Sequence, residues 1–126
     1  MIVVIQCAAS KRPQAGRMVA SGQPVHFVAH PQKAPNILDR IYAHQDDRTR
    51  DGSTWRRLVA EYNKNPGNNP LGLYPAFDLY KRDIYRRLVD KFDLKNVYIL
   101  SAGWGLIRAD FLTPSYDITF SGSADP

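Results

Sequence analysis

Two short segments of the chain concentrate side chains that could do chemistry. The first, "CAASKR" at residues 7–12, follows an apolar run and sets the hydroxyl of Ser10 beside the charges of Lys11 and Arg12. The small residues before them would let backbone amides approach an anion, so this segment predicts a phosphate site at the start of a loop. The GxxxxGK[ST] spacing of a P-loop is absent. The alternative is an ordinary strand-to-loop turn with exposed basic residues.

The second segment, residues 101–117, opens with "SAGWG" and closes with "PSYD". Gly103 and Gly105 bracket Trp104, so the backbone could turn sharply there and present the indole. An indole held in this way can stack on a base or on a sugar face. The alternative is that Trp104 closes one edge of the core.

The same segment holds two carboxylates, Asp110 and Asp117. Either one could act as an acid or base, or stabilise positive charge that develops on a sugar. Pro114 fixes the approach of the backbone to Tyr116 and Asp117. The alternative for each aspartate is a structural role as a turn cap.

The remaining ligand-type side chains do not indicate a metal. Cys7 is the only cysteine, and a lone cysteine is more often a small buried hydrophobe than a nucleophile. His26 and His30 are four residues apart in a stretch with strand composition, and that spacing shares a face only in a helix. We therefore expect neither a metal nor a cofactor.

Four segments have the composition of strands, residues 2–6, 24–30, 96–102 and 116–120. The first is a continuous β-branched run, which is typical of a strand covered on both faces in a parallel sheet. Residues 31–52 are charged and irregular, and they predict an excursion on the surface.

Two helices are expected between these strands. Ser53 or Thr54 can cap the first helix, whose apolar face comprises Trp55, Leu58, Val59 and Tyr62. Pro75 suits the first turn of the second helix, whose apolar stripe comprises Phe77, Tyr80, Ile84, Leu88 and Phe92.

The alternation of strands and helices predicts an α/β fold with a largely parallel sheet flanked by helices. Ligands bind at the carboxyl ends of the strands in such sheets. We therefore predict that residues 7–12 and 101–105 lie side by side and form two sides of one site.

The bulk composition fits a single globular domain over residues 1–126. No closing helix or strand follows "YDITF", so we expect this domain to lack C-terminal elements. No apolar run approaches the roughly 18 residues of a membrane span, and residues 1–5 lack the basic leader of a signal peptide. A cytoplasmic location without membrane contact is expected. The net charge of +5 is concentrated in the first half of the chain, which is compatible with phosphate-bearing partners.

The two segments also resemble a known group of proteins. "CAASKR" and "YILSAGWGLIRADFLTPSYDITF" are similar to the pattern C-S-x-x-K, then a hydrophobic strand with S-A-x-x-G-L, then P-Y-D. This pattern belongs to bacterial and phage proteins related to the YaaA-like peroxide-stress proteins. A similar Cys/Ser/Lys loop occurs in the catalytic domain of archaeosine synthase, an enzyme of modified-guanine chemistry in tRNA. The first motif departs from the pattern, because Ser10 lies directly before Lys11.

The resemblance covers the two strand ends and leaves out the middle of the chain. It implies an α/β fold and dealings with nucleic acid or its bases. Carried over position by position, it points to Cys7, Ser10, Lys11, Ser101, Gly105, Tyr116 and Asp117.

We therefore expect an enzyme that acts on a base or its glycosidic bond within nucleic acid, with DNA favoured over RNA. Ser10, Lys11 and Arg12 would bind phosphate, and Trp104 would stack on an extruded base. Asp117, or else Asp110, would stabilise an oxocarbenium-like sugar, with Lys11 as a further catalytic candidate. Two alternatives remain, a non-catalytic DNA- or RNA-binding stress or defence protein and an enzyme on free nucleotides.

Overall fold

The computed structural model of the chain describes residues 1–8, 10–34 and 40–117. A first sheet consists of β1 (Val3–Gln6), β6 (Val97–Ser101) and β7 (Gly105–Arg108), in the order β1-β6-β7. β1 and β6 run parallel, and β7 returns antiparallel to β6 after a short turn. The strands predicted at residues 2–6 and 96–102 are thus confirmed, whereas β7 was not predicted.

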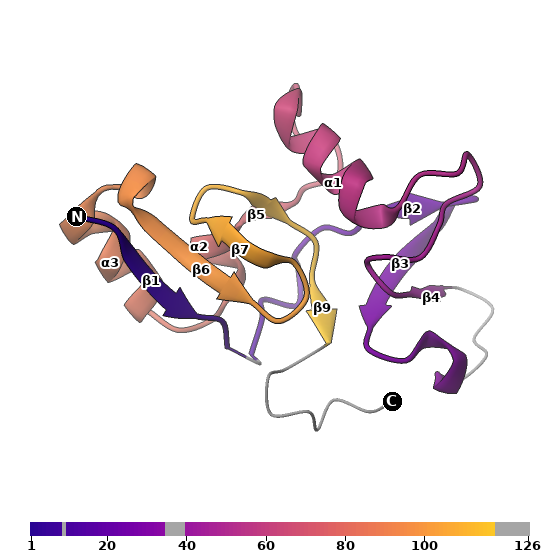
Figure 1. Cartoon of the computed structure of the whole chain (residues 1–126), viewed down its shortest axis with the longest axis horizontal. Helices are drawn as coiled ribbons and strands as arrows, with labels where there is room; N and C mark the ends of the chain where they lie inside the picture. The colour runs from indigo at the N-terminus through magenta and orange to yellow at the C-terminus, as the bar shows by residue number, and fades with distance from the viewer. Residues whose placement is uncertain (9, 35–39, 118–126) are drawn as a thin grey trace.

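Only one face of this sheet is covered. Val97 and Ile99 are fully buried on the inner face, and α3 (Ile84–Phe92) lies against that side (Figure 1). On the outer face Val4 is 55% exposed and Leu106 is 59% exposed. The expectation that the first strand is covered on both faces is therefore wrong, because no described element packs on the outer side.

A second sheet is built around β3 (Gln23–Val28). β2 (Val19–Ala20) pairs antiparallel with its first half, and β9 (Tyr116–Asp117) pairs parallel with its last two residues. β4 (Ile41–Ala43) runs parallel along the opposite edge. β4 therefore lies within residues 31–52, a range that was wrongly expected to be an irregular excursion. β5 (Tyr74–Pro75) and β8 (Leu112–Thr113) form a separate antiparallel pair.

The fold class predicted from the sequence is wrong. The described residues form nine strands and three α-helices, and the strands combine parallel and antiparallel pairs in more than one sheet. A largely parallel sheet flanked by helices would need a crossover helix after β6, and the chain makes a hairpin there instead. The strand expected at residues 116–120 is present at Tyr116–Asp117, and its remaining residues lie outside the described part of the chain.

The first predicted helix is confirmed as α1 (Trp55–Lys64). The Thr54 hydroxyl accepts a hydrogen bond from the backbone N–H of Arg57 at 3.2 Å and caps it. The second predicted helix is divided into α2 (Ala76–Leu79) and α3. Two 3₁₀ turns, η1 (Pro31–Lys33) and η2 (Leu94–Asn96), complete the helical elements of the described residues.

The break between α2 and α3 has a clear cause. Tyr80 is extended, with φ −86° and ψ 143°, and the chain around it bonds to the loop after β1. The N–H of Arg12 donates to the carbonyl of Leu79 at 2.8 Å, and the N–H of Lys81 donates to the carbonyl of Ser10 at 3.2 Å. These bonds replace helical ones and hold the Lys11 loop against the helical layer.

One hydrophobic core runs beneath both sheets. Its centre includes Phe27 of β3, whose ring meets two indoles edge-on. The ring centres are 6.0 Å apart for Trp55 and 4.9 Å apart for Trp104. Trp55 begins α1 and Trp104 lies in the β6–β7 turn, so the Phe27 ring joins three elements. No helix in the described ranges has the length and apolar character to cross a membrane.

Candidate functional site

The two segments singled out in the sequence lie side by side, as predicted. The backbone N–H of Cys7 donates to the carbonyl of Leu100 at 3.0 Å, and the N–H of Ala102 points at the Cys7 sulfur at 3.3 Å. The parallel pairing of β1 with β6 brings both strand ends to the same edge of the first sheet.

A cluster of hydroxyl and thiol groups occupies this edge, formed by the buried Tyr80, Ser101 and Tyr116 and the partly exposed Cys7. The two tyrosine hydroxyls are 2.6 Å apart. The side chains of Ser101 and Cys7 lie beside these hydroxyls. Burial raises the pKa of Tyr80 and of Tyr116 well above the ordinary range, so both phenols stay protonated. The hydroxyl cluster is a rigid support for its neighbours.

Lys11 lies on this cluster. Its Nζ is 4.1 Å from the centre of the Tyr116 ring and 6.0 Å from that of Tyr80, within cation–π range. Burial lowers the pKa of Lys11, and the nearby Asp117 carboxylate partly opposes that shift. Lys11 is thus an oriented, half-buried amine close to the Asp117 carboxylate.

Lys11 and Asp117 open onto a cavity of about 420 Å³, here called the basic pocket. Its lining includes Lys11, Arg12, Arg17, His26, Arg40 and Asp117. Among its described lining residues, four cationic side chains face a single carboxylate. Such an imbalance favours an anionic ligand.

The floor of the basic pocket is the outer face of the second sheet. His26 of β3 pairs with Tyr42 of β4, and Val28 of β3 pairs with Asp117 of β9. Side chains two apart in a strand share a face, so this register places these residues on one side. Val25 and Phe27 alternate with them and point into the core.

Two arginines approach each other at this pocket. Arg17 is half-buried, and its pKa is lowered by burial and then by the charge of Arg40. Arg12 is partly neutralised, because its Nε donates to the carbonyl of Asp78 at 2.8 Å and its guanidinium is 3.6 Å from the Asp78 carboxylate. Arg17 and Arg40 add two further positive charges to the lining of the pocket.

Several predicted site residues lie elsewhere. Trp104 is only 6% exposed, and its indole N–H donates to the carbonyl of Pro114 at 3.1 Å. It closes the core, the alternative considered from the sequence, and is not presented for stacking. Gly105 has φ +78° and permits the turn that leads into β7. Ser10 is exposed and is not among the lining residues of the basic pocket.

Asp110 is separated from the other candidates. Both of its carboxylate oxygens accept hydrogen bonds from Arg108 at 2.7 Å. The two side chains line a different cavity, beside Asn63 and Tyr98. Of the two carboxylates considered from the sequence, only Asp117 lines the basic pocket.

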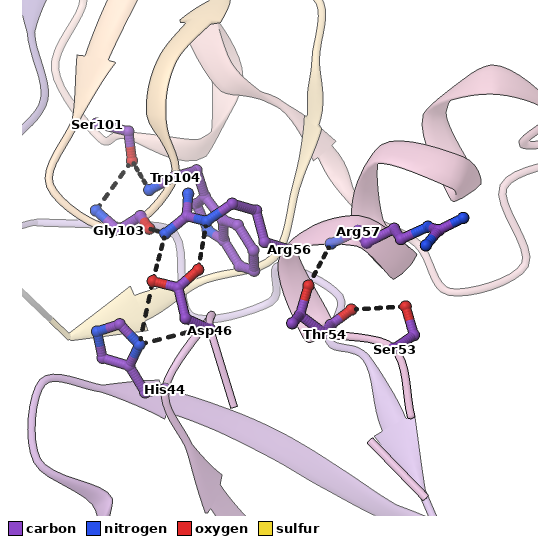
Figure 2. Close-up of polar contacts among 9 residues, drawn as sticks. All are labelled: His44, Asp46, Ser53, Thr54, Arg56, Arg57, Ser101, Gly103 and Trp104. Carbon is purple, nitrogen blue, oxygen red and sulfur yellow. Dashed lines mark hydrogen bonds and ion pairs between the residues drawn. The ribbon is translucent and has the colours of Figure 1, made fainter. Parts of the chain in front are cut away.

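A polar network that includes Arg56 of α1 holds the β6–β7 turn in place (Figure 2). Arg56 of α1 donates to Asp46 at 2.8 Å and to the carbonyl of Gly103 at 3.3 Å. The Ser101 hydroxyl accepts the N–H groups of Gly103 and Trp104 at 3.3 and 3.0 Å. Ser101, Gly103 and Trp104 therefore shape a turn that packs against Tyr116.

Gly103 is required by this packing. A Cβ atom at position 103 would lie 2.8 Å from the Tyr116 ring and 2.7 Å from the side-chain nitrogen of Gln45. Any side chain there would displace Tyr116, and with it the surface on which Lys11 rests.

Sequence reasoning missed several pocket residues, and Arg17, Arg40 and Tyr42 are the three that matter most for ligand binding. None of them follows a predicted strand, and two lie in the range expected to be irregular. The excess of basic residues in the first half of the chain was the one signal that pointed to them. In the part of the chain that the structure describes, no three His, Cys, Asp or Glu side chains gather as a metal site would require.

No protein-family model, curated protein or solved structure matches this chain. The resemblance to the YaaA-like group therefore rests on its two motifs, and the function must be inferred from the site.

Proposed function

We propose that the protein is an enzyme that acts on nucleic acid at a base or its glycosidic bond. One observation supports this function above the others. A carboxylate, Asp117, and an oriented amine, Lys11, lie together at the edge of a cavity that is otherwise basic. Cations suit the phosphates of the substrate, and the carboxylate suits positive charge on its sugar.

The division of labour follows from these charges. In glycosidic hydrolysis the bond between C1′ and the base nitrogen breaks, and its electrons leave with the base. The sugar carries positive charge until the oxygen of water adds to C1′. Asp117 would stabilise that charge, and the proton released from water passes to the base or to solvent. Lys11 and Arg12 would hold a flanking phosphate.

Base stacking, in this proposal, belongs to Tyr42 instead of Trp104. Tyr42 is half-buried and lines the basic pocket, with its ring 5.8 Å from that of His26. Aromatic rings of this kind provide a stacking surface without regard to base identity. Trp104 packs on Phe27 from the other side of the sheet.

Asp117→Asn tests the enzymatic function because it keeps the shape of the side chain and removes its charge. The substrates are oligonucleotides that carry a panel of modified bases, and the released base is measured by mass spectrometry. We expect product formation to fall by about two orders of magnitude or more, with binding preserved or strengthened.

Asp110→Asn is the matched control, since Asp110 pairs with Arg108 outside the pocket. Its activity should stay near that of the unmodified protein. Full activity of Asp117→Asn would overturn the catalytic assignment. Binding of oligonucleotides without turnover of any base would favour the non-catalytic binding protein. Turnover of mononucleotides alone would favour the enzyme on free nucleotides.

A further inference from the structure

We propose that the Arg17–Arg40 side of the basic pocket binds the phosphate group of a nucleotide, while Tyr42 stacks on its base. This inference names the ligand of the site more closely than the proposed function does. It rests on that function only for the choice of a nucleotide over another phosphate ester.

The first support is the presence of two guanidinium groups at one cavity. Arg17 and Arg40 line the same cavity, and each raises the energy of the other's charge. Guanidinium groups bind phosphate oxygens in pairs of parallel hydrogen bonds, so two of them at one cavity suit a phosphate.

The second support is the register of the second sheet. Met18 accepts a hydrogen bond from the N–H of Val25 at 2.8 Å, so Arg17 lies at the end of β2 that is next to His26. Arg40 directly precedes β4, which carries Tyr42 opposite His26. The two cations therefore reach the pocket from opposite edges of β3, with the aromatic pair between them.

The third support is size. The basic pocket measures about 420 Å³, within the range of roughly 300–1,000 Å³ that is usual for small-molecule sites. A single nucleotide suits this volume. A phosphate at the arginines and a base on Tyr42 would leave the sugar to face the Lys11 and Asp117 side.

Titration calorimetry on the full chain separates the parts of this proposal. The probes are a nucleoside 5′-monophosphate, the matching nucleoside, inorganic phosphate and a short oligonucleotide. We expect the monophosphate to bind at least about tenfold more tightly than the nucleoside, because the charged hydrogen bonds come from its phosphate. Equal binding of the two would overturn the proposal. Saturation by the oligonucleotide at lower concentration than by the monophosphate would identify a phosphate within a chain, and the reverse would identify a free nucleotide.

Arg17→Gln and Arg40→Gln should each weaken the binding of the monophosphate and of inorganic phosphate by about tenfold or more. Tyr42→Leu should weaken the binding of the monophosphate and leave the binding of inorganic phosphate unchanged. Tyr42→Phe should bind both as the unmodified protein does. Arg57→Gln is the matched control, because Arg57 is 74% exposed and pairs with Glu61 on α1. Arginine variants that bind phosphate as well as this control does would overturn the proposal.

A melting experiment guards against loss of fold. Arg17→Gln should keep a melting temperature close to that of the unmodified protein, although phosphate affinity falls. A variant that loses both stability and binding would indicate a structural role for Arg17 and count against the site. If glycosidic activity is absent but phosphate binding follows this pattern, the proposed function fails and the phosphate site stands. If glycosidic activity is present but phosphate binding does not follow this pattern, the phosphate site is wrong and the proposed function stands.

Discussion

Lys11 differs from an ordinary surface lysine because it is partly buried and lies over an aromatic ring. Its ammonium rests on the Tyr116 ring at 4.1 Å, and the phenol of that ring is fixed from behind by the hydroxyl of Tyr80. The aromatic face favours the charged amine, whereas burial disfavours it and lowers its pKa. This balance makes the charge of Lys11 sensitive to pH in a range where arginine would not respond.

Phosphate affinity should therefore decline as the pH rises into the alkaline range. The sign follows from the direction of the shift, because a lowered pKa means that Lys11 loses its proton at a lower pH than a free lysine, near about 10.4. The loss of that charge removes one attraction to the anion. Affinity for a fluorescent oligonucleotide, measured from about pH 7 to about pH 10, should fall toward the upper end.

Lys11→Arg supplies the comparison, since arginine keeps its charge over this whole range. Its affinity should stay flat where that of the unmodified protein declines. Parallel curves for the two proteins would show that another group titrates.

At the scale of elements, the position of the site depends on how α1 is anchored. The helix begins at the Thr54 cap and sends Arg56 to the carbonyl of Gly103 in the β6–β7 turn. The same turn packs against Tyr116. A change at the start of α1 can therefore reach the surface that supports Lys11, through Arg56 and the turn.

Thr54→Ala should destabilise the protein by about 1 kcal/mol, because the N–H of Arg57 loses its hydrogen-bond acceptor. Urea unfolding measures the change. Thr54→Ser keeps the hydroxyl and should recover most of the loss. Equal stability of the alanine and serine variants would show that the cap contributes little here.

Elements fixed by local sequence were the ones that could be predicted. β1, β6 and α1 follow from β-branched runs, a capping threonine and an apolar face. The division of the second helix could not be predicted, because Tyr80 continues the helical pattern and is drawn out of it by the loop around Lys11. β7 was missed for a similar reason, since "GLIR" is a strand only when β6 lies beside it.

The candidate site divides in the same way. Lys11 and Asp117 could be found because each lies in a polar segment that follows a predicted strand, and both line the basic pocket. Arg17, Arg40 and Tyr42 come from stretches without such a signal. Only the pairing of β3 with its neighbours brings them together.

At the scale of the whole molecule, part of the positive charge gathers at one cavity. The chain carries a net charge of +5, and four cationic side chains line the basic pocket. Electrostatic attraction of this kind acts on any phosphate backbone before bases are recognised. The outer face of the first sheet combines the exposed Val4 and Leu106 with Arg108, whose charge is paired with Asp110.

Nucleic-acid affinity should fall steeply with salt, since each neutralised phosphate releases counterions. The slope of log affinity against log salt should be close to −0.9 for each phosphate contact on duplex DNA. The Arg17→Gln/Arg40→Gln double variant should flatten this slope by about two units. Arg87→Gln, on the exposed side of α3, should leave it unchanged. Binding that is indifferent to salt would contradict a phosphate-based interaction.

Phe27 gives the molecule an optical property. Both tryptophans of the chain, Trp55 and Trp104, contact this one ring, and both indoles are more than nine-tenths buried. The tryptophan fluorescence of the protein therefore originates from one region of the core, directly beneath the strand that forms the pocket floor. A ligand that settles on β3 would disturb this region from above, so its arrival can be followed by fluorescence without any label.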